Sequence, residues 1–395
     1  MKTVDSYNFG GKRALIRVDF NVPLSDTFEI TDDSRMTAAL PSIKKIIEDG
    51  GSVVLMSHLG RPKNGPENKF SLIHLVPHLE KLTGATVEFS NDCISDLAIA
   101  KSKNLEPGTV HLIENLRFHS QETAGDKAFA EKLAEHGDIY VNDALGTAHR
   151  AHASTAVVAE SFEDKCFGYL MAKEVANAKK LMSNPERPFT SIVGGAKVSD
   201  KILIIENLLS IADHIIIGGG MAYTFKVAQG GTIGNSLFEA DRVETCKEIL
   251  KAAEAKGVQI HLPEDSTVAD AFSNDANTAL CDSDKIEDGW MGLDIGVKAV
   301  EAFSDVLLKS KTILWNGPMG VFEMAKFENG TKSVAQAVAD ATKAGAFSLI
   351  GGGDSSAAVK KFGFTDDVSY VSTGGGALLE FFEGKELPGI VAVES

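Results

Sequence analysis

Four apolar runs in the second half of the chain lead directly into glycine-rich turns, and no other feature constrains the fold as strongly. The clearest passes from the run 346–350 through three glycines at 351–353 into an alanine-rich helical stretch. The other junctions follow apolar runs at 191–193, 215–217 and 370–372. Glycine lets the backbone approach a ligand closely, and a helix start attracts anions such as phosphate. The pattern indicates a parallel sheet whose strand ends share one phosphate-bearing ligand.

The length of the chain indicates two domains, because 395 residues exceed what one hydrophobic core usually holds. Strand-like and helical patterns alternate in both halves, which is typical of α/β domains with a doubly wound, Rossmann-like parallel sheet. A long helix is predicted over 167–183, where Pro185 and Pro188 end it. We place the boundary on this hinge helix, with a first domain over 1–169 and a second over 170–379 that includes the hinge helix at about 170–183.

The expected elements follow this alternation. In the first domain, strands are expected at 12–18, 52–56, 85–89, 109–113 and 138–141, and helices at 34–48 and 71–82. In the second domain, with helices between them, strands are expected near Phe189, His214, Val258, Lys311, Ala346 and Val368.

Charge and cysteine usage restrict the class of protein. The net charge of −16 argues against a nucleic-acid or anionic-membrane partner, since either would favour a basic surface. The four cysteines lie far apart without a C-x-x-C pair, which indicates neither a zinc site nor a disulfide framework and fits a reducing cytosol. The first residues lack the apolar core of a signal peptide, and no run is long enough to cross a bilayer. We expect a cytoplasmic protein.

Arginines are concentrated in the first domain, mostly at predicted strand ends. In this acidic chain they indicate a binding site for a small polyanion, because guanidinium groups match phosphate and carboxylate bidentately. Surface ion pairs explain any single arginine about equally well. Arg17 lies inside a strand, where a buried pair with Asp19 explains it as well. Of the histidines, His58 beside a Gly-Arg-Pro turn is the better ligand candidate, whereas His74, His78, His111 and His136 are expected to be structural.

Two lysines follow the glycine turn at 194–195. Lys197 and Lys201 stand four residues apart, so we expect them on one face of a helix start, where an anion would relieve their repulsion. A solvated helix start is the alternative. Asp354 is the only acid on a glycine turn; beside a phosphate it implies Mg²⁺, and otherwise it is an N-cap. Asn316 and Glu323 fit a nucleoside pocket. Neither a Walker A loop nor the G-x-G-x-x-G fingerprint occurs.

The sequence motifs closely resemble those of one family, phosphoglycerate kinase. They occur in family order over nearly the whole chain: 17–23 (RVDFNVP), 57–62 (SHLGRP), 114–118 (ENLRF), 142–152 (NDALGTAHRAH), 194–201 (GGAKVSDK), 315–318 (WNGP), 351–354 (GGGD) and 373–376 (TGGG). Departures are small. Leu145 stands where Phe is usual, and Tyr169 near the hinge is less typical.

The resemblance implies a monomeric glycolytic enzyme that transfers the γ-phosphoryl group of ATP reversibly to the carboxylate of 3-phosphoglycerate, in line and with hinge closure. It implies Mg²⁺ as cofactor, held by Asp354, and a C-terminal segment, about 380–395, that packs on the first domain. The implied catalytic residues are Arg35, Lys197, Lys201 and Gly375. The implied 3-phosphoglycerate site comprises Asp19, Asn21, Arg35, His58, Leu59, Gly60, Arg61, Arg117 and Arg150. The implied nucleotide site comprises Lys197, Lys201, Gly220, Gly292, Asn316, Glu323, Gly352, Gly353, Asp354 and Ser355.

Two alternatives stay open from the sequence. An NAD-dependent oxidoreductase would use the same strand–glycine turns, although the dinucleotide fingerprint is missing. A non-catalytic two-lobed protein that traps a phosphorylated metabolite would need the arginines but not Lys197, Lys201 and Asp354 in the other domain.

Overall fold

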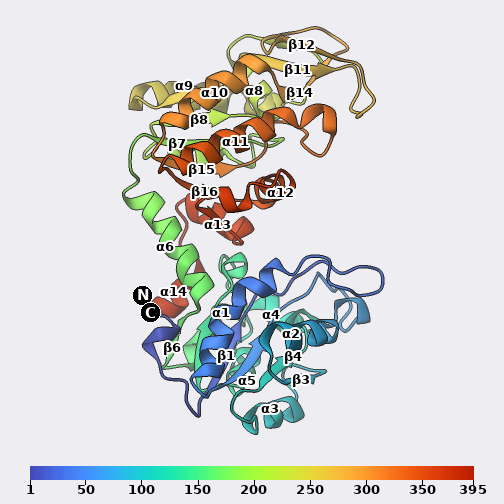
Figure 1. Cartoon of the computed structure of the whole chain (residues 1–395), viewed down its shortest axis with the longest axis vertical. Coiled ribbons are helices and arrows are strands. Elements are labelled where there is room, and N and C mark those ends of the chain that lie inside the picture. Colours follow the sequence, from blue (N-terminus) through green and yellow to red (C-terminus); the bar gives the residue numbers. More distant parts are fainter. The chain divides into compact units, whose positions relative to one another are not determined.

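The computed structural model describes residues 1–395, and the chain divides into two compact units (Figure 1). Unit 1 comprises Met1–Ala176 and Lys385–Ser395, and unit 2 comprises Asn177–Gly384. The chain leaves unit 1 within helix α6 (Tyr169–Ser183) and returns to it after Gly384. Each unit contains a six-stranded sheet with helices packed on it, which confirms the predicted α/β class.

The sheet of unit 1 has the order β3-β4-β2-β1-β5-β6, and every neighbouring pair is parallel. The carboxyl ends of all six strands therefore lie along one edge. The central strand β2 is buried at every residue, as expected where helices cover both faces. The strands are β1 (Arg13–Arg17), β2 (Ser52–Met56), β3 (Val87–Ser90), β4 (Val110–Ile113), β5 (Ile139–Asn142) and β6 (Lys165–Phe167).

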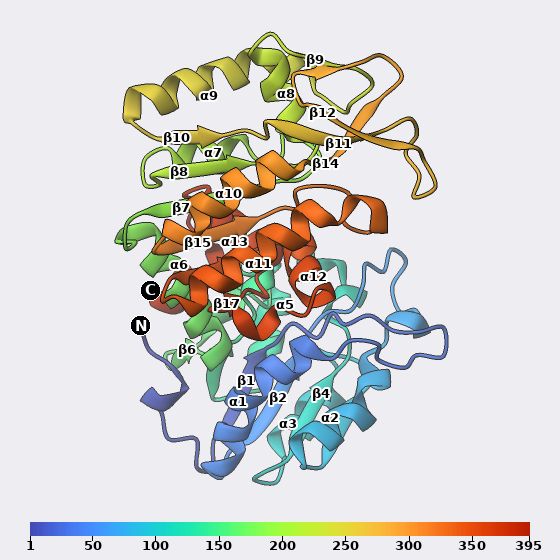
Figure 2. The ribbon, with the colours of Figure 1, turned by 45° about the horizontal axis from the view of Figure 1, so that its top comes forward.

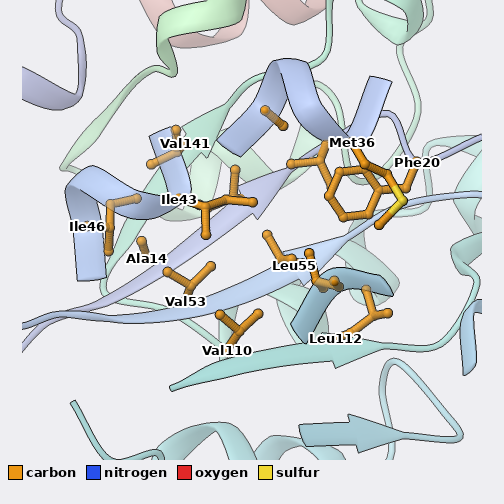
Figure 3. Close-up of a cluster of buried hydrophobic side chains, with 14 of the residues drawn as sticks. Ala14, Phe20, Met36, Ile43, Ile46, Val53, Leu55, Val110, Leu112 and Val141 are labelled. Carbon is orange, nitrogen blue, oxygen red and sulfur yellow. The ribbon is translucent and has the colours of Figure 1, made fainter. Parts of the chain in front are cut away.

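Helix α1 covers one face of this sheet with a stripe of apolar side chains. Met36, Ile43 and Ile46 project from one side of the helix toward the strands, as their helical spacing predicts (Figure 3). The facing strand residues include Ala14, Val53, Leu55, Val110, Leu112 and Val141. Burying each large aliphatic side chain contributes about 1.5–3 kcal/mol. Between β1 and β6, the helices of unit 1 are α1 (Ser34–Glu48), α2 (Val76–Thr83), α3 (Asp96–Lys103), α4 (Ser120–Ala124) and α5 (Lys127–Ala134).

Both chain termini lie beside the edge strand β6 (Figures 1 and 2). The Phe167 N–H donates to Lys2 O at 3.1 Å. Helix α14 (Pro388–Glu394) attaches through Gly389, whose N–H donates to Ala148 O at 2.8 Å and whose carbonyl accepts from Asn142 Nδ2 at 3.1 Å. The end of the chain is thus bonded to the loop region after β5.

The sheet of unit 2 has the order β10-β8-β7-β15-β16-β17, again parallel throughout. Helices α10 and α11 pack on each other and share a core with strand residues such as Ile192, Ile313 and Trp315 (Figure 2). The strands are β7 (Phe189–Val193), β8 (His214–Ile217), β10 (Gln259–His261), β15 (Thr312–Asn316), β16 (Phe347–Ile350) and β17 (Tyr370–Val371). The helices are α7 (Ile202–Leu208), α8 (Met221–Ala228), α9 (Val243–Lys256), α10 (Val297–Lys309), α11 (Asn329–Lys343), α12 (Gly353–Lys361) and α13 (Gly375–Phe382).

Between the strands near Val258 and Lys311, unit 2 contains the expected helix, α10, and also an antiparallel sheet that the sequence did not predict. The order of this sheet is β12-β11-β14, and all three strands precede α10. The exposed first three residues of β12 explain the omission, because a strand without a buried face has no apolar alternation. The strands are β11 (Asp265–Ala269), β12 (Thr278–Asp282) and β14 (Met291–Ile295); β9 (Thr232–Ile233) and β13 (Lys285–Ile286) form a short parallel pair.

Two predicted helices begin later than the sequence pattern suggested. Phe167 does not start α6; it belongs to β6 and pairs with Asn142 of β5. The helix expected at 71–82 is divided into a 3₁₀ turn, Leu72–Leu75, and α2, which begins at Val76. Pro77 explains the second start, because proline lacks an N–H and suits the first turn of an α-helix. None of the helices is long and apolar enough to span a membrane.

Candidate functional site

The candidate substrate residues of unit 1 lie along the carboxyl edge of its sheet. Asp19 and Asn21 follow β1, the segment His58 to Arg61 follows β2, Arg117 follows β4 and Arg150 follows β5. Because parallel strands end at the same edge, residues far apart in sequence converge there. Arg35 joins them from the first turn of α1.

Hydrogen bonds join five of these residues in a continuous network. Arg35 Nη1 lies 3.3 Å from Asp19 Oδ2 and donates to Asn21 O at 2.9 Å. The Asn21 side chain accepts from Gly60 N–H at 2.8 Å, and Gly60 O accepts from Arg117 Nη1 at 3.0 Å. The network fixes both guanidinium groups relative to one backbone segment, so an anion between them meets preorganised donors.

Two cavities open at this edge. One of about 710 Å³ is lined by Arg61, Arg117 and Arg150, together with Lys63, His119 and His152. The other, of about 450 Å³, is lined by Asn21 and Arg35 among others. Such a concentration of cationic groups in an acidic chain provides a site for a small anion.

His58 lines neither of these cavities, yet its protonation state follows from its surroundings. The side chain is buried, and Arg17 Nη2 lies 3.3 Å from its Nδ1. An arginine can only donate, so Nδ1 accepts and the imidazole proton is on Nε2. Burial, and then the nearby Arg17 and Arg117, hold the pKa of His58 well below its usual value. His58 is therefore a neutral hydrogen-bond donor.

Arg17 does not form the buried pair with Asp19 that was one of its two possible explanations. Its Nε donates to Ser154 Oγ at 2.8 Å, and its Nη1 donates to Val18 O. Ser154 in turn donates through Oγ to Glu122 Oε1 at 2.6 Å. Asp19 pairs with Arg35 instead. Alternate residues of a strand face opposite sides of the sheet. On the side that Arg17 faces, the loop that contains Ser154 supplies its hydrogen-bond partner.

Arg117 remains cationic although it is half-buried. Burial, followed by the charge of Arg17, lowers its pKa to about 10. A guanidinium with this pKa is protonated at neutral pH. Burial is the main cause of the lowered pKa, and the positive charges of Arg150 and Arg61 also contribute to it.

Asn115 and Glu122 support this site, and the sequence reasoning did not assign them. Asn115 Nδ2 donates to Leu59 O and Phe70 O, both at 2.8 Å, and its Oδ1 accepts from Arg117 N–H at 3.0 Å. Glu122 is fully buried and holds Ser154. Asn115 occurs inside a motif already singled out, but no signal in the sequence marks Glu122.

In unit 2, the glycine turns follow the carboxyl ends of β7, β8, β16 and β17. Several glycines are required because the turns pack on each other. Gly317 has φ +104°, and a Cβ there would overlap Gly194 O. Gly219 has φ +69°, and a Cβ there would lie 2.5 Å from Gly195 O. A side chain at either position would separate the turns.

The two lysines do not share a helix face, which corrects that part of the prediction. Helix α7 begins only at Ile202, so Lys197 lies in a turn and is exposed. Lys201 precedes the helix, and its Nζ donates to Asn316 Oδ1. Burial lowers the pKa of Lys201, while Asp200 and Asp354 oppose this shift. The ammonium group is thus held at the end of β15.

A cavity of about 510 Å³ opens beside these turns. Its lining includes Gly220, Gly292, Glu323 and Asp354 from the predicted nucleotide residues, but not Lys197, Lys201, Asn316, Gly352, Gly353 or Ser355. Leu237, Phe272, Met291 and Val321 provide apolar walls. Apolar walls with a few polar groups and exposed glycine backbone suit a nucleoside with its phosphates.

Asn316 and Ser355 are internal to the turns. Asn316 Nδ2 donates to Gly351 O at 2.8 Å, and Ser355 Oγ accepts from Gly317 N–H at 2.6 Å. Both side chains are buried. At Gly353, Gly375 and Gly376, by contrast, an added Cβ would meet nothing within 4 Å. The helix starts of α12 and α13 thus present open backbone.

Asp294 is a further residue of this cavity that the sequence did not reveal. It accepts from Gly330 N–H at 2.7 Å and from Ile295 N–H at 2.9 Å. Burial raises its pKa to about 7, although both hydrogen bonds oppose the shift. An added Cβ at Gly320 or Gly330 would overlap Asp294 Oδ1, so these glycines make room for it.

Comparison with known proteins decides between the alternatives. The family model for phosphoglycerate kinase matches residues 4–385. The chain is 52% identical over 417 aligned positions to the phosphoglycerate kinase of Porphyromonas gingivalis, covering 99% of this chain and 100% of that protein. It is 52% identical over 394 residues to that of Chloroherpeton thalassium, covering 100% and 99%. The chain belongs to the phosphoglycerate kinase family.

A solved structure agrees with this assignment. The phosphoglycerate kinase of Coxiella burnetii superposes with a TM-score of 0.91 at 41% identity, covering 100% of this chain and 98% of that one. The chain is therefore a phosphotransferase with phosphoglycerate kinase activity, and its role in glycolysis follows from that activity.

Proposed function

We propose that unit 1 binds 3-phosphoglycerate and unit 2 binds ATP or ADP with Mg²⁺. The observation that supports this division is the chemical difference between the arginine-lined cavity of unit 1 and the cavity of unit 2. The cavity with Arg61, Arg117 and Arg150 suits a small, highly charged anion. The cavity of unit 2 has apolar walls beside glycine turns and suits a nucleotide.

Transfer requires positioning and charge neutralisation rather than a general base. The acceptor is a carboxylate, which is already ionised at neutral pH. The charge on the moving phosphoryl group is compensated by Arg35 from unit 1 and by Lys201, Lys197 and the backbone at Gly375 from unit 2. Arg35 is suited to this role because Asp19 and Asn21 O fix its guanidinium group.

Asp354 is the residue that would hold Mg²⁺. It is exposed in the first turn of α12 and lines the nucleotide cavity. Mg²⁺ prefers oxygen ligands and is commonly held by one or two carboxylates together with substrate phosphates, so the residue fits. When bound, the ion neutralises phosphate charge. Glu323, which lines the same cavity, would accept ribose hydroxyl groups.

The test is Arg35→Ala, measured by steady-state kinetics in both directions. Removing one donor to the transition state lowers kcat on the order of 10²–10³-fold, whereas the affinity for Mg-ADP should change less than twofold because Arg35 belongs to unit 1. Arg13→Ala is the matched control. Arg13 begins β1 at the opposite edge of the sheet, in an ion pair with Asp138. Near-normal kcat in Arg35→Ala would refute the assignment.

We also propose that the chain acts as a cytoplasmic monomer without nucleic-acid or membrane partners. Its net charge of −16 disfavours polyanionic partners, and its four cysteines are all free, which fits a reducing compartment. Sedimentation equilibrium should give the monomer mass of 42.0 kDa. Twice that mass at micromolar concentration would contradict the monomer.

A further inference from the structure

Three side chains to which no catalytic role is assigned meet at the carboxyl edge of unit 1. Asp92 and Cys93 follow β3, and His119 follows β4, the neighbouring strand. One potential ligand atom from each lies within 4.8 Å of the other two. His119 Nε2 is 3.3 Å from Asp92 Oδ1. The topology thus brings a thiol, an imidazole and a carboxylate together from two separate segments.

These donors are those of a zinc-type cation. Thiolate and imidazole favour Zn²⁺ over Mg²⁺ or Ca²⁺, which prefer oxygen alone. Tetrahedral coordination with bonds of about 2.0–2.3 Å separates ligand atoms by roughly 3.3–3.8 Å. The His119–Asp92 pair, at 3.3 Å, already has this spacing, and the Cys93 sulfur lies within 4.8 Å of both ligand atoms.

Contacts behind the cluster hold its side chains in place. The Cys93 carbonyl is 3.0 Å from His136 Nε2, and the His119 ring packs on Phe129 with centroids 5.4 Å apart. Such supporting contacts orient metal ligands.

We propose that Asp92, Cys93 and His119 form a binding site for one thiophilic divalent cation of the zinc class. His119 also lines the arginine-lined cavity, so the cluster borders that cavity. Sites with three protein ligands leave a fourth position to water or a small anion. The competing explanation is an ordinary His119–Asp92 ion pair beside a buried thiol.

The experiment titrates the metal-free full-length chain with Zn²⁺ in competition with a chromogenic chelator, and separately with Co²⁺. We expect one equivalent of Zn²⁺ per chain and a near-ultraviolet band from thiolate-to-cobalt charge transfer. His119→Gln should weaken Zn²⁺ binding by at least about tenfold, and Cys93→Ala should remove the cobalt band. Asp92→Asn, on a partly exposed side chain, serves as a further variant if Cys93→Ala fails to fold.

Two control variants separate this site from nonspecific binding. Cys246→Ala removes a buried thiol of unit 2, and His261→Gln breaks the close His214–His261 pair, whose ring nitrogens are 3.1 Å apart. Both should bind Zn²⁺ like the wild type. The proposal is overturned if the wild type binds no Zn²⁺, if His119→Gln binds it equally well, or if only His261→Gln loses binding.

Discussion

Four polar side chains in unit 1 form a directional hydrogen-bond relay whose tautomers follow from one carbonyl group. Cys93 O can only accept, so His136 donates from Nε2 and accepts at Nδ1. Ser102 therefore donates to His136 at 2.6 Å and accepts from His111 Nδ1 at 2.8 Å. His111 Nε2 must then accept from Ser90 Oγ at 2.8 Å. Each proton has one assigned place, and both imidazoles are neutral.

This relay predicts how stability depends on pH. Burial lowers the pKa of His111 to about 3 and of His136 to about 4, whereas both titrate near 6.5 in the unfolded chain. Between these values the unfolded chain binds more protons. The contribution of these two histidines to the free energy of unfolding is therefore fully present above about pH 6.5. It falls as the pH decreases, by about 1.4 kcal/mol per pH unit for each histidine. Chemical denaturation at a series of pH values measures this slope.

Ser102→Ala tests the relay directly. The variant leaves His136 Nδ1 and the His111 Nδ1–H without their partner, which costs about 1–3 kcal/mol of unfolding free energy at pH 7.5. Ser210→Ala is the control, because Ser210 is exposed and its hydroxyl bonds only to Asn207 O one turn earlier. We expect less than about 0.5 kcal/mol for it. Equal stabilities of the two variants would contradict the assigned relay.

The sequence identified residues better than it identified their partners. Arg61, Arg117 and Arg150 could be predicted because each follows an apolar run, and runs of this kind become strands that end at one edge. Glu122 could not be predicted, because only its burial and its hydrogen bond with Ser154 mark it as important, and neither can be recognised in the sequence. The partner of Arg17 could not be identified for a similar reason, since the loop that supplies Ser154 comes 137 residues later.

At the scale of elements, parallel strands were predicted well because buried strands form continuous apolar runs. The start of α7 and the antiparallel sheet were not predicted. The turn at 194–201 is stabilised by contacts distant in sequence, such as Ser199 with Glu239, whose carboxylate accepts from Ser199 Oγ at 2.6 Å. The four-residue spacing between Lys197 and Lys201 gives no information about that contact.

The packing of glycine turns in unit 2 yields a prediction about elements. Gly317→Ala adds a Cβ at φ +104° that overlaps Gly194 O, so β7 and β15 can no longer keep their turns together. We expect a loss of about 3 kcal/mol or more in stability and a weakened affinity for Mg-ADP. Thermal unfolding and calorimetric titration measure the two effects.

Gly257→Ala is the matched control for this prediction. Gly257 ends α9 with φ +72°, and an added Cβ there would meet nothing within 4 Å. Only the conformational cost of about 1–2 kcal/mol remains, and nucleotide affinity should be unchanged. If both variants lose the same stability, backbone conformation rather than turn packing explains the glycines.

At the scale of the whole molecule, unit 1 is completed by the last residues of the chain. Helix α14 buries Ile390 and Val393, and the preceding Leu387 is also buried. Gly389 fits closely, since an added Cβ would lie 3.0 Å from Ala148 Cα. These contacts attach the C-terminus to the loop that follows β5 and leads to Arg150.

Truncation after Glu386 should therefore destabilise unit 1 far more than unit 2. Losing three buried apolar side chains removes about 4.5–9 kcal/mol, and Asn142 Nδ2 and Ala148 O lose their bonds to Gly389. Hydrogen exchange should rise in β5, β6 and the segment before Arg150 but not in β7 or β15. Ile390→Ala should reproduce part of the effect, and Val391→Ala, at a side chain 46% exposed, should not. Uniformly raised exchange in both units would show instead that the tail stabilises the chain as one cooperative whole.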